Sequence, residues 1–278
     1  MKKPLLTTSL AAAAVVLSAA CIMVMDPEQT TSWQPRGEFR RTVEFAAGGT
    51  LTLENKAGNV EITGWDKDAV EVVAQGAAAE PGEKRKVRAY GFWEIKPDVE
   101  IKQTDGSLSI RTRPFDGPGD LPAVDYTIRV PNSILLSGIR MGKGNLTVSD
   151  VFGRIEVSLD RGDLAVSNFS GSVDLFIGTG SADVEVLDVR DQDTIAISSR
   201  EGDIVLRLGA GTGARVEAEA PRGEVRSDLD LGARTPAPSV SGRIGTGEAA
   251  VTLKASDGRI EIIAIKDVAG AVPVTKGK

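Results

Sequence analysis

The sequence predicts an all-β protein, a single elongated β-solenoid (β-helix-like) whose coils each hold two strands and roughly 20 residues. Three observations lead to this prediction. Segments such as 58–63, 154–159 and 259–262 alternate apolar and polar residues, which is the pattern of a strand with one buried face. Glycine recurs every nine residues from Gly144 to Gly180. Beyond the N-terminal segment, the sequence has no convincing helical stripe of apolar residues.

The N-terminus resembles an export signal followed by a tether. Two lysines stand near the start, residues 5–17 are mostly apolar, and small residues lead directly into Cys21, the single cysteine of the chain. This layout is typical of a signal peptide over 1–20. The cysteine resembles the lipidated residue of a bacterial lipobox, although Ser18 stands where that motif usually has a bulky aliphatic residue. We therefore expect lipidation of Cys21, a membrane anchor through that lipid, and a flexible tether over 21–37.

Two other interpretations of the N-terminus stay open. The chain could be exported and cut after Ala20 without a lipid, or it could keep 5–17 as an uncleaved anchor, although that run is short for a membrane span. Ile22, which follows the cysteine, is not the aspartate linked with retention in the inner membrane of some bacteria. The expected location is therefore the outer membrane, where there is one, facing either the periplasm or the surface.

The main domain is predicted over 38–268, followed by a C-terminal tail over 269–278. Its first part is less regular than the rest. Strands are expected near 41–46, 50–55, 58–63, 69–74, 99–103, 107–112 and 124–130. Prolines and glycines break the pattern at 114–122 and again, with Pro236 and Pro238, at 233–239. After the second break, strands at 251–253 and 260–262 are predicted to form the last coil.

The glycine spacing reveals an internal repeat between these breaks. Residues 145–162 align with 163–180 without a gap. The matching positions are Leu146 and Leu164, Val148 and Val166, Ser149 and Ser167, Gly153 and Gly171, Ile155 and Val173, Val157 and Leu175, and Gly162 and Gly180. The repeat continues through Ala182, Val184, Ile195, Ile197 and Gly202, with four extra residues, and then through Ile204, Leu206, Val216, Ala218 and Gly223.

A single coil should not be stable alone. Fixing its backbone costs roughly 20–40 kcal/mol, whereas about six buried aliphatic side chains return on the order of 9–18 kcal/mol. Stacked coils share hydrogen bonds and bury both sides of each aliphatic row, so the repeat predicts a stack with glycine at its sharp corners. An antiparallel sandwich of hairpins stays open as the alternative.

The composition excludes several kinds of site. The 278 residues include no histidine, which removes the commonest general base and the commonest metal ligand. One cysteine allows neither an internal disulfide nor a thiolate zinc site. The formal net charge is −6 with both signs interspersed, which argues against a nucleic-acid partner. We expect no catalytic residues, no cofactor and no metal.

At this point the sequence resembles a known family. The segments Gly58–Trp65, Val70–Val72, Ile128–Pro131 and Gly144–Val148, with the repeated Gly-x-aliphatic-x-aliphatic pattern, make residues 45–265 similar to bacterial domains of unknown function that are provisionally called adhesins. The resemblance implies a β-solenoid on an exported or anchored protein. It implies no catalytic residues, because its motifs are short and structural.

Several motifs have a functional and a structural interpretation, and the structural one is favoured in each case. Arg161-Gly162-Asp163 spells an integrin-binding tripeptide, but Gly162 already belongs to the glycine spacing. The acids Asp188, Asp191 and Asp193 could bind calcium or be solvated loop residues. The glycine-rich stretch 209–213 lacks the lysine and helix of a phosphate-binding loop.

Two asparagines and three aromatic residues also have both a functional and a structural interpretation. Asn145 and Asn168 begin glycosylation-type triplets, but both fall inside predicted coils. The aromatic residues Trp65, Phe92 and Trp93 could stack on sugar rings or cover an end of the solenoid.

These observations favour a non-enzymatic cell-envelope lipoprotein that acts as a binding or adhesion module, with the membrane and an unidentified glycan or envelope protein as partners. A periplasmic accessory of an envelope-stress response is the alternative. A polysaccharide-acting β-helix enzyme is less favoured, because nothing marks out its candidate acidic pair, Asp160 and Asp174. Polymerisation through exposed strand edges at the solenoid ends is a further hypothesis.

Overall fold

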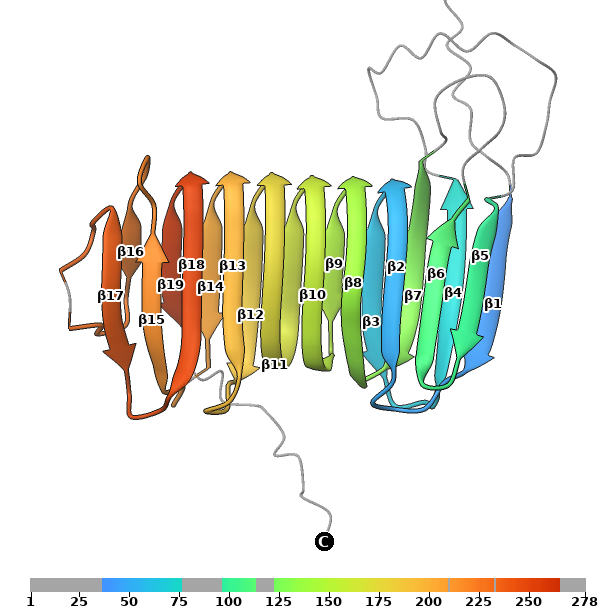
Figure 1. Ribbon diagram of the computed structural model, residues 1–278, viewed down its shortest axis with the longest axis horizontal. Coiled ribbons are helices and arrows are strands. Elements are labelled where there is room, and N and C mark those ends of the chain that lie inside the picture. The colour runs from blue at the N-terminus through green and yellow to red at the C-terminus, as the bar shows by residue number, and fades with distance from the viewer. Residues whose placement is uncertain (1–36, 77–96, 114–122, 210, 233, 266–278) are drawn as a thin grey trace, which may run out of the picture. The chain divides into compact units, whose positions relative to one another are not determined.

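The computed structural model describes residues 37–76, 97–113, 123–209, 211–232 and 234–265. These residues form 19 β-strands and no helix, so the all-β prediction is confirmed (Figure 1). In this part of the chain, no helical segment is present that could cross a membrane. The predicted signal peptide with Cys21, the C-terminal tail, and the residues Phe92 and Trp93 lie outside the described residues, as does all of the predicted tether but Gly37.

The strands are named in chain order. They are β1 (Glu38–Glu44), β2 (Thr50–Ala57), β3 (Val60–Trp65), β4 (Ala69–Gly76), β5 (Val99–Thr104), β6 (Ser107–Thr112), β7 (Val124–Pro131), β8 (Ser133–Lys143), β9 (Leu146–Ser149), β10 (Phe152–Arg161), β11 (Leu164–Thr179), β12 (Ala182–Asp188), β13 (Thr194–Glu201), β14 (Ile204–Leu208), β15 (Ala214–Glu219), β16 (Val225–Ser227), β17 (Ser239–Ile244), β18 (Ala249–Asp257) and β19 (Ile260–Ala264).

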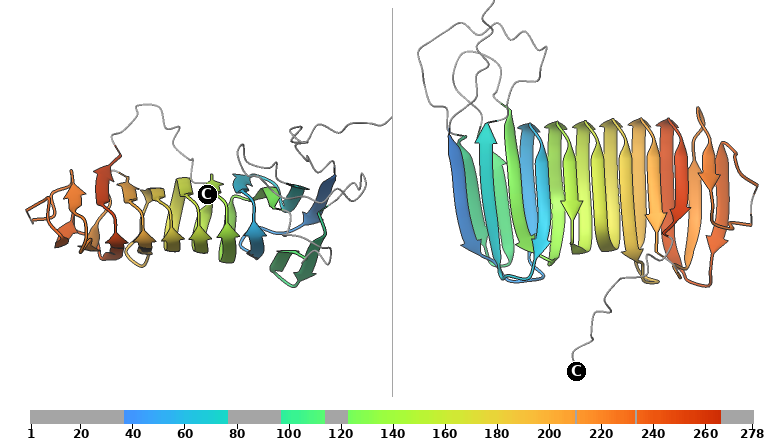
Figure 2. Two further views of the ribbon diagram at one scale, coloured as in Figure 1. Left: turned by 90° about the horizontal axis from the view of Figure 1, so that it is seen from above. Right: turned by 180° about the vertical axis from the view of Figure 1, so that it is seen from behind.

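The strands lie in two layers that face each other (Figure 2). In the first layer, the order of neighbours is β5, β6, β2, β8, β10, the second half of β11, β13, β18, β15 and β17. In the second layer, it is β1, β4, β7, β3, β9, the first half of β11, β12, β14, β19 and β16. We call two consecutive strands, one in each layer, a two-strand unit.

Pairing between neighbouring units in the middle of the stack is parallel and in register. Leu164 lies opposite Leu146 in the second layer, and Val173 lies opposite Ile155 in the first. Both offsets are 18 residues. The next unit is offset by 22 residues, with Ile195 opposite Val173, because a longer connection joins β12 to β13.

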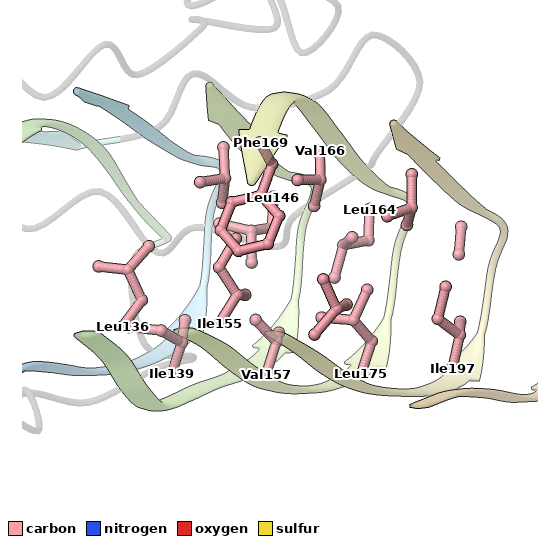
Figure 3. Close-up of a cluster of buried hydrophobic side chains, with 14 of the residues drawn as sticks. Leu136, Ile139, Leu146, Ile155, Val157, Leu164, Val166, Phe169, Leu175 and Ile197 are labelled. Carbon is pink, nitrogen blue, oxygen red and sulfur yellow. The ribbon is translucent and has the colours of Figure 1, made fainter. Parts of the chain in front are cut away.

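The space between the layers is filled by aliphatic side chains (Figure 3). Alternate residues of each strand point inward, so that Val157 and Leu175 from the first layer meet Leu164 and Val166 from the second. Each of these four side chains is at most 4% exposed. Among the described residues, the buried polar side chains are Asn55, Ser199 and Thr212. Each unit therefore contributes an almost entirely apolar slice to one continuous core.

The order of the units departs from chain order at both ends of the stack. The unit β2–β3 lies between β6–β7 and β8–β9, and β18–β19 lies between β13–β14 and β15–β16. Figure 1 shows this as a break in colour order, with β18 between β13 and β15. The predicted last coil, 251–262, is therefore last in the chain but not last in the stack.

The aligned positions of the last repeat must be corrected accordingly. Val216 and Ala218 were expected to follow Ile195 and Ile197 in the stack, but Val251 and Leu253 lie opposite that pair. Val216 and Ala218 lie one unit further away, across β18. Gly223 likewise stacks on Gly258 and not on Gly202. The physical reason is that β15 and β18 have the same alternation of apolar and polar residues and the same backbone groups. Either strand could therefore form the hydrogen bonds along the edge of β13.

Both ends of the stack change to antiparallel pairing. At one end β1 pairs with β4, β4 with β7, and β5 with β6. At the other end β17 pairs with β15, and Ala237 bridges Val225. Leu231, which is 4% exposed, places its carbonyl oxygen against Gly242 of β17. Because β16 is only three residues long, the second layer ends here in a short edge strand, which limits pairing with another chain.

One corner of the stack is a column of glycines, in the order Gly58, Gly144, Gly162, Gly180, Gly202, Gly258 and Gly223. The φ angle of Gly162 is 137°, and a Cβ on this residue would lie 2.0 Å from the carbonyl oxygen of Gly144. Gly171 stacks on Gly153 in the same way at the opposite corner. Two corners in each 18-residue unit explain why glycine recurs every nine residues.

We predict that Gly162→Ala destabilises the protein by more than about 3 kcal/mol, because alanine adds both backbone strain and a clash with the neighbouring unit. Gly106→Ala is the matched control, since Gly106 has a φ of 68° with nothing within 4 Å of its Cβ position. It should cost about 1–2 kcal/mol. Urea unfolding of both variants measures the difference, and equal losses would show that the close approach at Gly162 does not demand glycine.

A buried tyrosine gives the fold a pH dependence. Tyr126 is 2% exposed, and its hydroxyl lies 2.7 Å from Thr112 Oγ1, which in turn donates to Asn55 Oδ1 at 3.3 Å. Burial raises the pKa of Tyr126 from 10.0 to about 12, which the hydrogen bond to Thr112 partly offsets. The neutral phenol is thus favoured by folding, and the associated stability is complete below pH 10 and lost as the pH rises towards 12.

We predict that Tyr126→Phe flattens the loss of stability between pH 10 and 12, while lowering stability at neutral pH by about 1 kcal/mol through the lost hydrogen bond. Unfolding followed at several alkaline pH values measures this. A slope that Tyr126→Phe leaves as steep as in the wild type would contradict the assignment.

Candidate functional site

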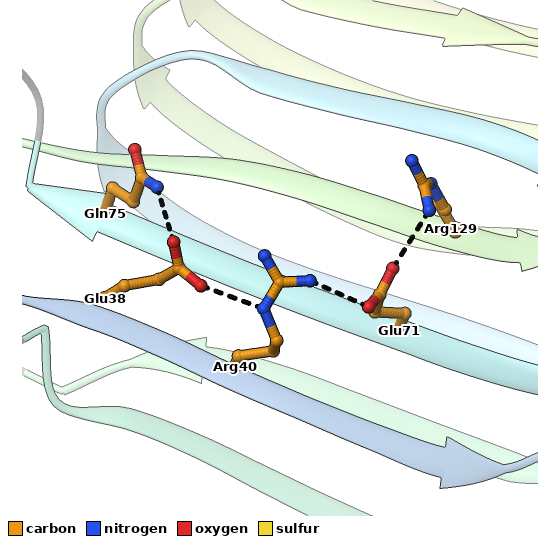
Figure 4. Close-up of polar contacts among 5 residues, drawn as sticks. All are labelled: Glu38, Arg40, Glu71, Gln75 and Arg129. Atoms are coloured by element: carbon orange, nitrogen blue, oxygen red, sulfur yellow. Dashed lines mark hydrogen bonds and ion pairs between the residues drawn. The ribbon is translucent and has the colours of Figure 1, made fainter.

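A network of charged side chains crosses β1, β4 and β7 at one end of the second layer (Figure 4). Arg40 donates from Nε to Glu38 Oε1 and from a terminal nitrogen to Glu71 Oε1, both at 2.9 Å. Arg129 donates to Glu71 Oε2 at 3.3 Å, and Gln75 donates to Glu38 Oε2 at 2.9 Å. The antiparallel register places Arg129 directly opposite Glu71, so the network follows from the strand pairing.

These contacts are electrostatically modest. The hydrogen bond from Arg40 is the largest cause that lowers the pKa of Glu38, and the same hydrogen bond raises the pKa of Arg40. The Arg40 side chain is 56% exposed, and exposed ion pairs contribute little because water screens them. The network holds the edge strand β1 to β4 and puts charge on that edge. It offers no nucleophile, and its carboxylates are already engaged by arginine.

Trp65 lies at the end of β3 beside this network. Its indole N–H donates to the carbonyl oxygen of Ala69 at 2.8 Å. Lys67 Nζ lies 4.7 Å from the ring centroid, and Arg129 Cζ lies 5.9 Å from it. Since β3 pairs with β7 on one side and β9 on the other, Trp65 does not cover an end of the stack, and that expectation is wrong for this residue. Cations from the chain itself already contact the ring.

The tripeptide Arg161-Gly162-Asp163 is built into the glycine corner. The backbone N–H of Asp163 donates to Asn145 Oδ1 at 3.0 Å, and Asp163 Oδ1 accepts from the N–H of Ser181 at 2.8 Å. Asp163 and Asn145 thus belong to a ladder in which each side chain accepts a backbone hydrogen bond from the next unit. This explains both the tripeptide and the asparagine of the first glycosylation-type triplet.

Asn168, in the second such triplet, also has structural contacts. Its φ is 49°, its side-chain amide donates to a carboxylate oxygen of Asp150, and its backbone N–H donates to Glu185 Oε1 at 3.2 Å. Asparagine is one of the residues that tolerate this left-handed conformation.

Two of the three acidic residues at the β12–β13 connection accept hydrogen bonds from the chain. Asp193 accepts from Ser172 Oγ at 3.1 Å and from the Arg190 N–H at 2.9 Å. Asp191 accepts from the Glu248 N–H at 3.1 Å, and Asp188 ends β12 opposite Ser170. No group of three or more acidic side chains able to hold a metal is found in the described ranges.

The glycine-rich stretch 209–213 forms a tight turn, apart from Ala210, which lies outside the described residues. The hydroxyl of Thr212 donates to the carbonyl oxygen of Gly209 at 2.8 Å. A Cβ on Gly213 would lie 2.2 Å from the backbone nitrogen of Gly247. Close packing accounts for glycine at this position.

The acidic pair considered for an enzyme is not brought together. Asp174 on β11 lies opposite Glu156 of β10, and not opposite Asp160. Asp160 is four residues further along the strand, which corresponds to roughly 13 Å. Throughout the described residues, no buried side-chain nitrogen or oxygen lacks a hydrogen-bond partner, so none points to a missing ligand.

A shallow depression of about 440 Å³ is lined by β16, its neighbour β19 and residues 235–236. It is lined by Arg226, Ser227, Asp228, Thr235, Pro236, Glu261, Ile262 and Ile263. Arg226 is already paired with Glu224, and Ser227 Oγ both donates to and accepts from Leu229. Arg226 and Ser227 are thus engaged by the chain itself, whereas no ion pair or side-chain hydrogen bond within the described residues involves Asp228, Thr235 or Glu261.

Among the residues that the structure describes, four large apolar side chains are exposed, at 39–41%: Leu135, Phe152, Phe176 and Leu187. Sequence reasoning missed them. The signal was present for Phe176, because the run Leu175-Phe176-Ile177 interrupts the alternation and its middle residue must point outward if the flanking two point inward.

Comparisons with solved structures give distant similarities. A Clostridium sporogenes protein provisionally named a cell adhesion protein is 16% identical, with a TM-score of 0.45, covering 82% of this chain and 99% of its own. A provisional adhesin of Bacteroides fragilis is 15% identical with a TM-score of 0.32, covering 84% and 100%. A provisional lipid-binding protein of Parabacteroides distasonis is 10% identical with a TM-score of 0.21, covering 84% and 98%. At these identities and TM-scores, the similarities do not identify a function for this chain.

No curated protein matches the chain. A family model does match it, over residues 47–263, which is well over half of the 278 residues and spans nearly all of the strands described above. The chain therefore belongs to the Toastrack DUF4097 family.

Proposed function

We propose that this protein is a non-enzymatic, lipid-anchored module of the bacterial cell envelope, a β-solenoid that binds a macromolecular partner on its outer strand faces. One observation carries the proposal: outward side chains of successive units stand in straight rows across the layers. In the first layer, for example, Ser158, Phe176 and Ser198 lie directly opposite one another on three neighbouring strands.

Such rows suit an extended partner. Neighbouring strands are about 4.8 Å apart, so a row repeats a side-chain position at a constant short spacing. The corner glycines and the inter-unit hydrogen bonds fix these positions before any partner arrives. A preorganised surface loses less conformational entropy on binding than a mobile one, which favours affinity.

The chemistry available on the chain supports a binding role over catalysis. The sequence has no histidine, and Asp160 and Asp174 are too far apart to share a reacting group. The export signal and Cys21 support an envelope location.

For the anchor, we expect Cys21→Ser to move the full-length chain from the membrane pellet to the soluble envelope fraction, because the single lipid attachment point is lost. Intact-mass measurement should show that the wild-type protein carries the added acyl mass and that the variant does not. Ser32→Ala, in the predicted tether, is the control and should stay in the membrane. A wild-type chain without added mass would refute lipidation.

For the binding role, the full-length Cys21→Ser chain should bind isolated cell envelopes in a saturable manner, measured by cosedimentation. Gly106→Ala in the same background should bind as well as its parent, since that glycine has open space around its Cβ position. Heat-unfolded protein gives the background. Binding no greater than that background would argue against a binding module.

A further inference from the structure

An exposed aromatic ring stands in the middle of the first layer. Phe176 lies in the second half of β11, with neighbouring strands on both sides, and is 41% exposed. The inward-pointing residues beside it, Leu175 and Ile177, are 1% and 0% exposed, so the core at this position is already filled. Phe176 therefore contributes its apolar surface to the outside of the molecule.

The residues around Phe176 leave its ring accessible. The residues opposite it are Ser158 on β10 and Ser198 on β13, both small, and Gly178 follows two positions along the strand. Arg200 places Cζ 5.9 Å from the ring centroid, so a cation of the chain lies over part of one ring face, as at Trp65, while Phe176 remains 41% exposed. An aromatic ring with serine on both sides forms a local apolar spot among small and polar side chains.

Exposed carboxylates lie on both sides of this ring along the strands. Asp174 lies two residues before Phe176, with Glu156 opposite it on β10, and Asp160 lies two residues after Ser158. Glu156 accepts a hydrogen bond from Ser137 Oγ at 3.0 Å. Within the described ranges, the carboxylates of Asp160 and Asp174 are without an ion-pair or hydrogen-bond partner. They are free acceptors at fixed places beside an apolar ring.

We propose that this surface, formed by Glu156, Ser158, Asp160, Asp174, Phe176 and Ser198, binds an uncharged polysaccharide. A pyranose ring presents C–H groups on its face, and these fit the electron-rich face of phenylalanine. Its hydroxyl groups are donors, and ionised carboxylates are strong acceptors for them. The inference rests on the proposed function, because it names the chemistry of the partner that the strand faces bind.

Charge and shape favour this partner over two others. Arg140 lies opposite Ser158 on β8, and Lys254 lies opposite Ser198 on β18. With Arg200 beside the ring, three cations balance the three carboxylates, so the surface attracts neither a polyanion nor a polycation. The centre of a protein interface is usually depleted of charged residues and carries clustered apolar anchors. Here a single ring stands among serines and charged side chains of both signs, which is the arrangement expected for an uncharged ligand rich in hydroxyl groups.

The test uses the full-length Cys21→Ser chain and affinity electrophoresis in gels that contain a soluble neutral glucan, a neutral mannan or, as the acidic comparison, alginate. We expect retardation by at least one neutral polymer and none by alginate. Phe176→Ala should weaken retardation roughly tenfold. Phe152→Ala is the matched control, because Phe152 is equally exposed but starts β10 away from this surface, and it should change affinity less than about twofold.

A second variant tests the acceptors. Asp174→Asn keeps the size of the side chain but removes the charge, and it should weaken neutral-glycan binding severalfold while leaving the urea midpoint unchanged. Unfolding curves of Phe176→Ala should also match the parent, since the ring lies outside the core.

The possible failures are distinguishable. If the parent chain binds envelopes but neither neutral polymer, the glycan inference is overturned while the binding role stands. Loss of envelope binding in Phe176→Ala without any glycan binding would indicate a protein partner, which also overturns the inference. Equal weakening by Phe152→Ala and Phe176→Ala would show that the surface named here is not the site.

Discussion

The close approach of neighbouring two-strand units at the glycine corner is the constraint on which the rest of the structure depends. At Gly162 the chain passes so near the Gly144 carbonyl that no side chain fits. Directly afterwards, Asp163 receives a hydrogen bond from Ser181 and donates one to Asn145. This corner therefore fixes the spacing between neighbouring units. It also sets the register in which their strands pair in both layers. The straight outward rows are a consequence of it.

A stack built this way has no natural end, because each unit exposes unpaired backbone groups to the next one. The two ends of the stack limit further strand pairing in different ways. Beside β1, an arginine-carboxylate network puts charge along an antiparallel edge strand. At the other end, Leu231 packs against β17 and the second layer shortens to three residues. The charged network is thus better explained by the need to end the stack than by ligand binding.

The sequence predicted the position of a residue correctly wherever the local alternation and glycine spacing determine its strand and its pairing partner. Alternation and glycine spacing pointed to the pairing of Leu146 with Leu164, because corners and strands repeat within one unit. The order of units could not be found this way. Val216 and Val251 have the same size, parity and glycine context, so nothing local distinguishes which one lies beside Ile195. That choice depends on how distant connections cross the ends of the stack.

The same reasoning separates side chains that serve the fold from those that do not. Leu175 and Ile177 are buried, and replacing either would leave a cavity. Phe176 between them gains nothing from the core, and an exposed aromatic ring promotes unwanted association. Exposed single apolar residues are common on proteins. What distinguishes Phe176 is its setting, in which carboxylates, small hydroxyl side chains and Arg200 surround a ring that a fixed strand register holds in place. The fold does not account for this combination, whereas the proposed recognition of a hydroxyl-rich ligand does.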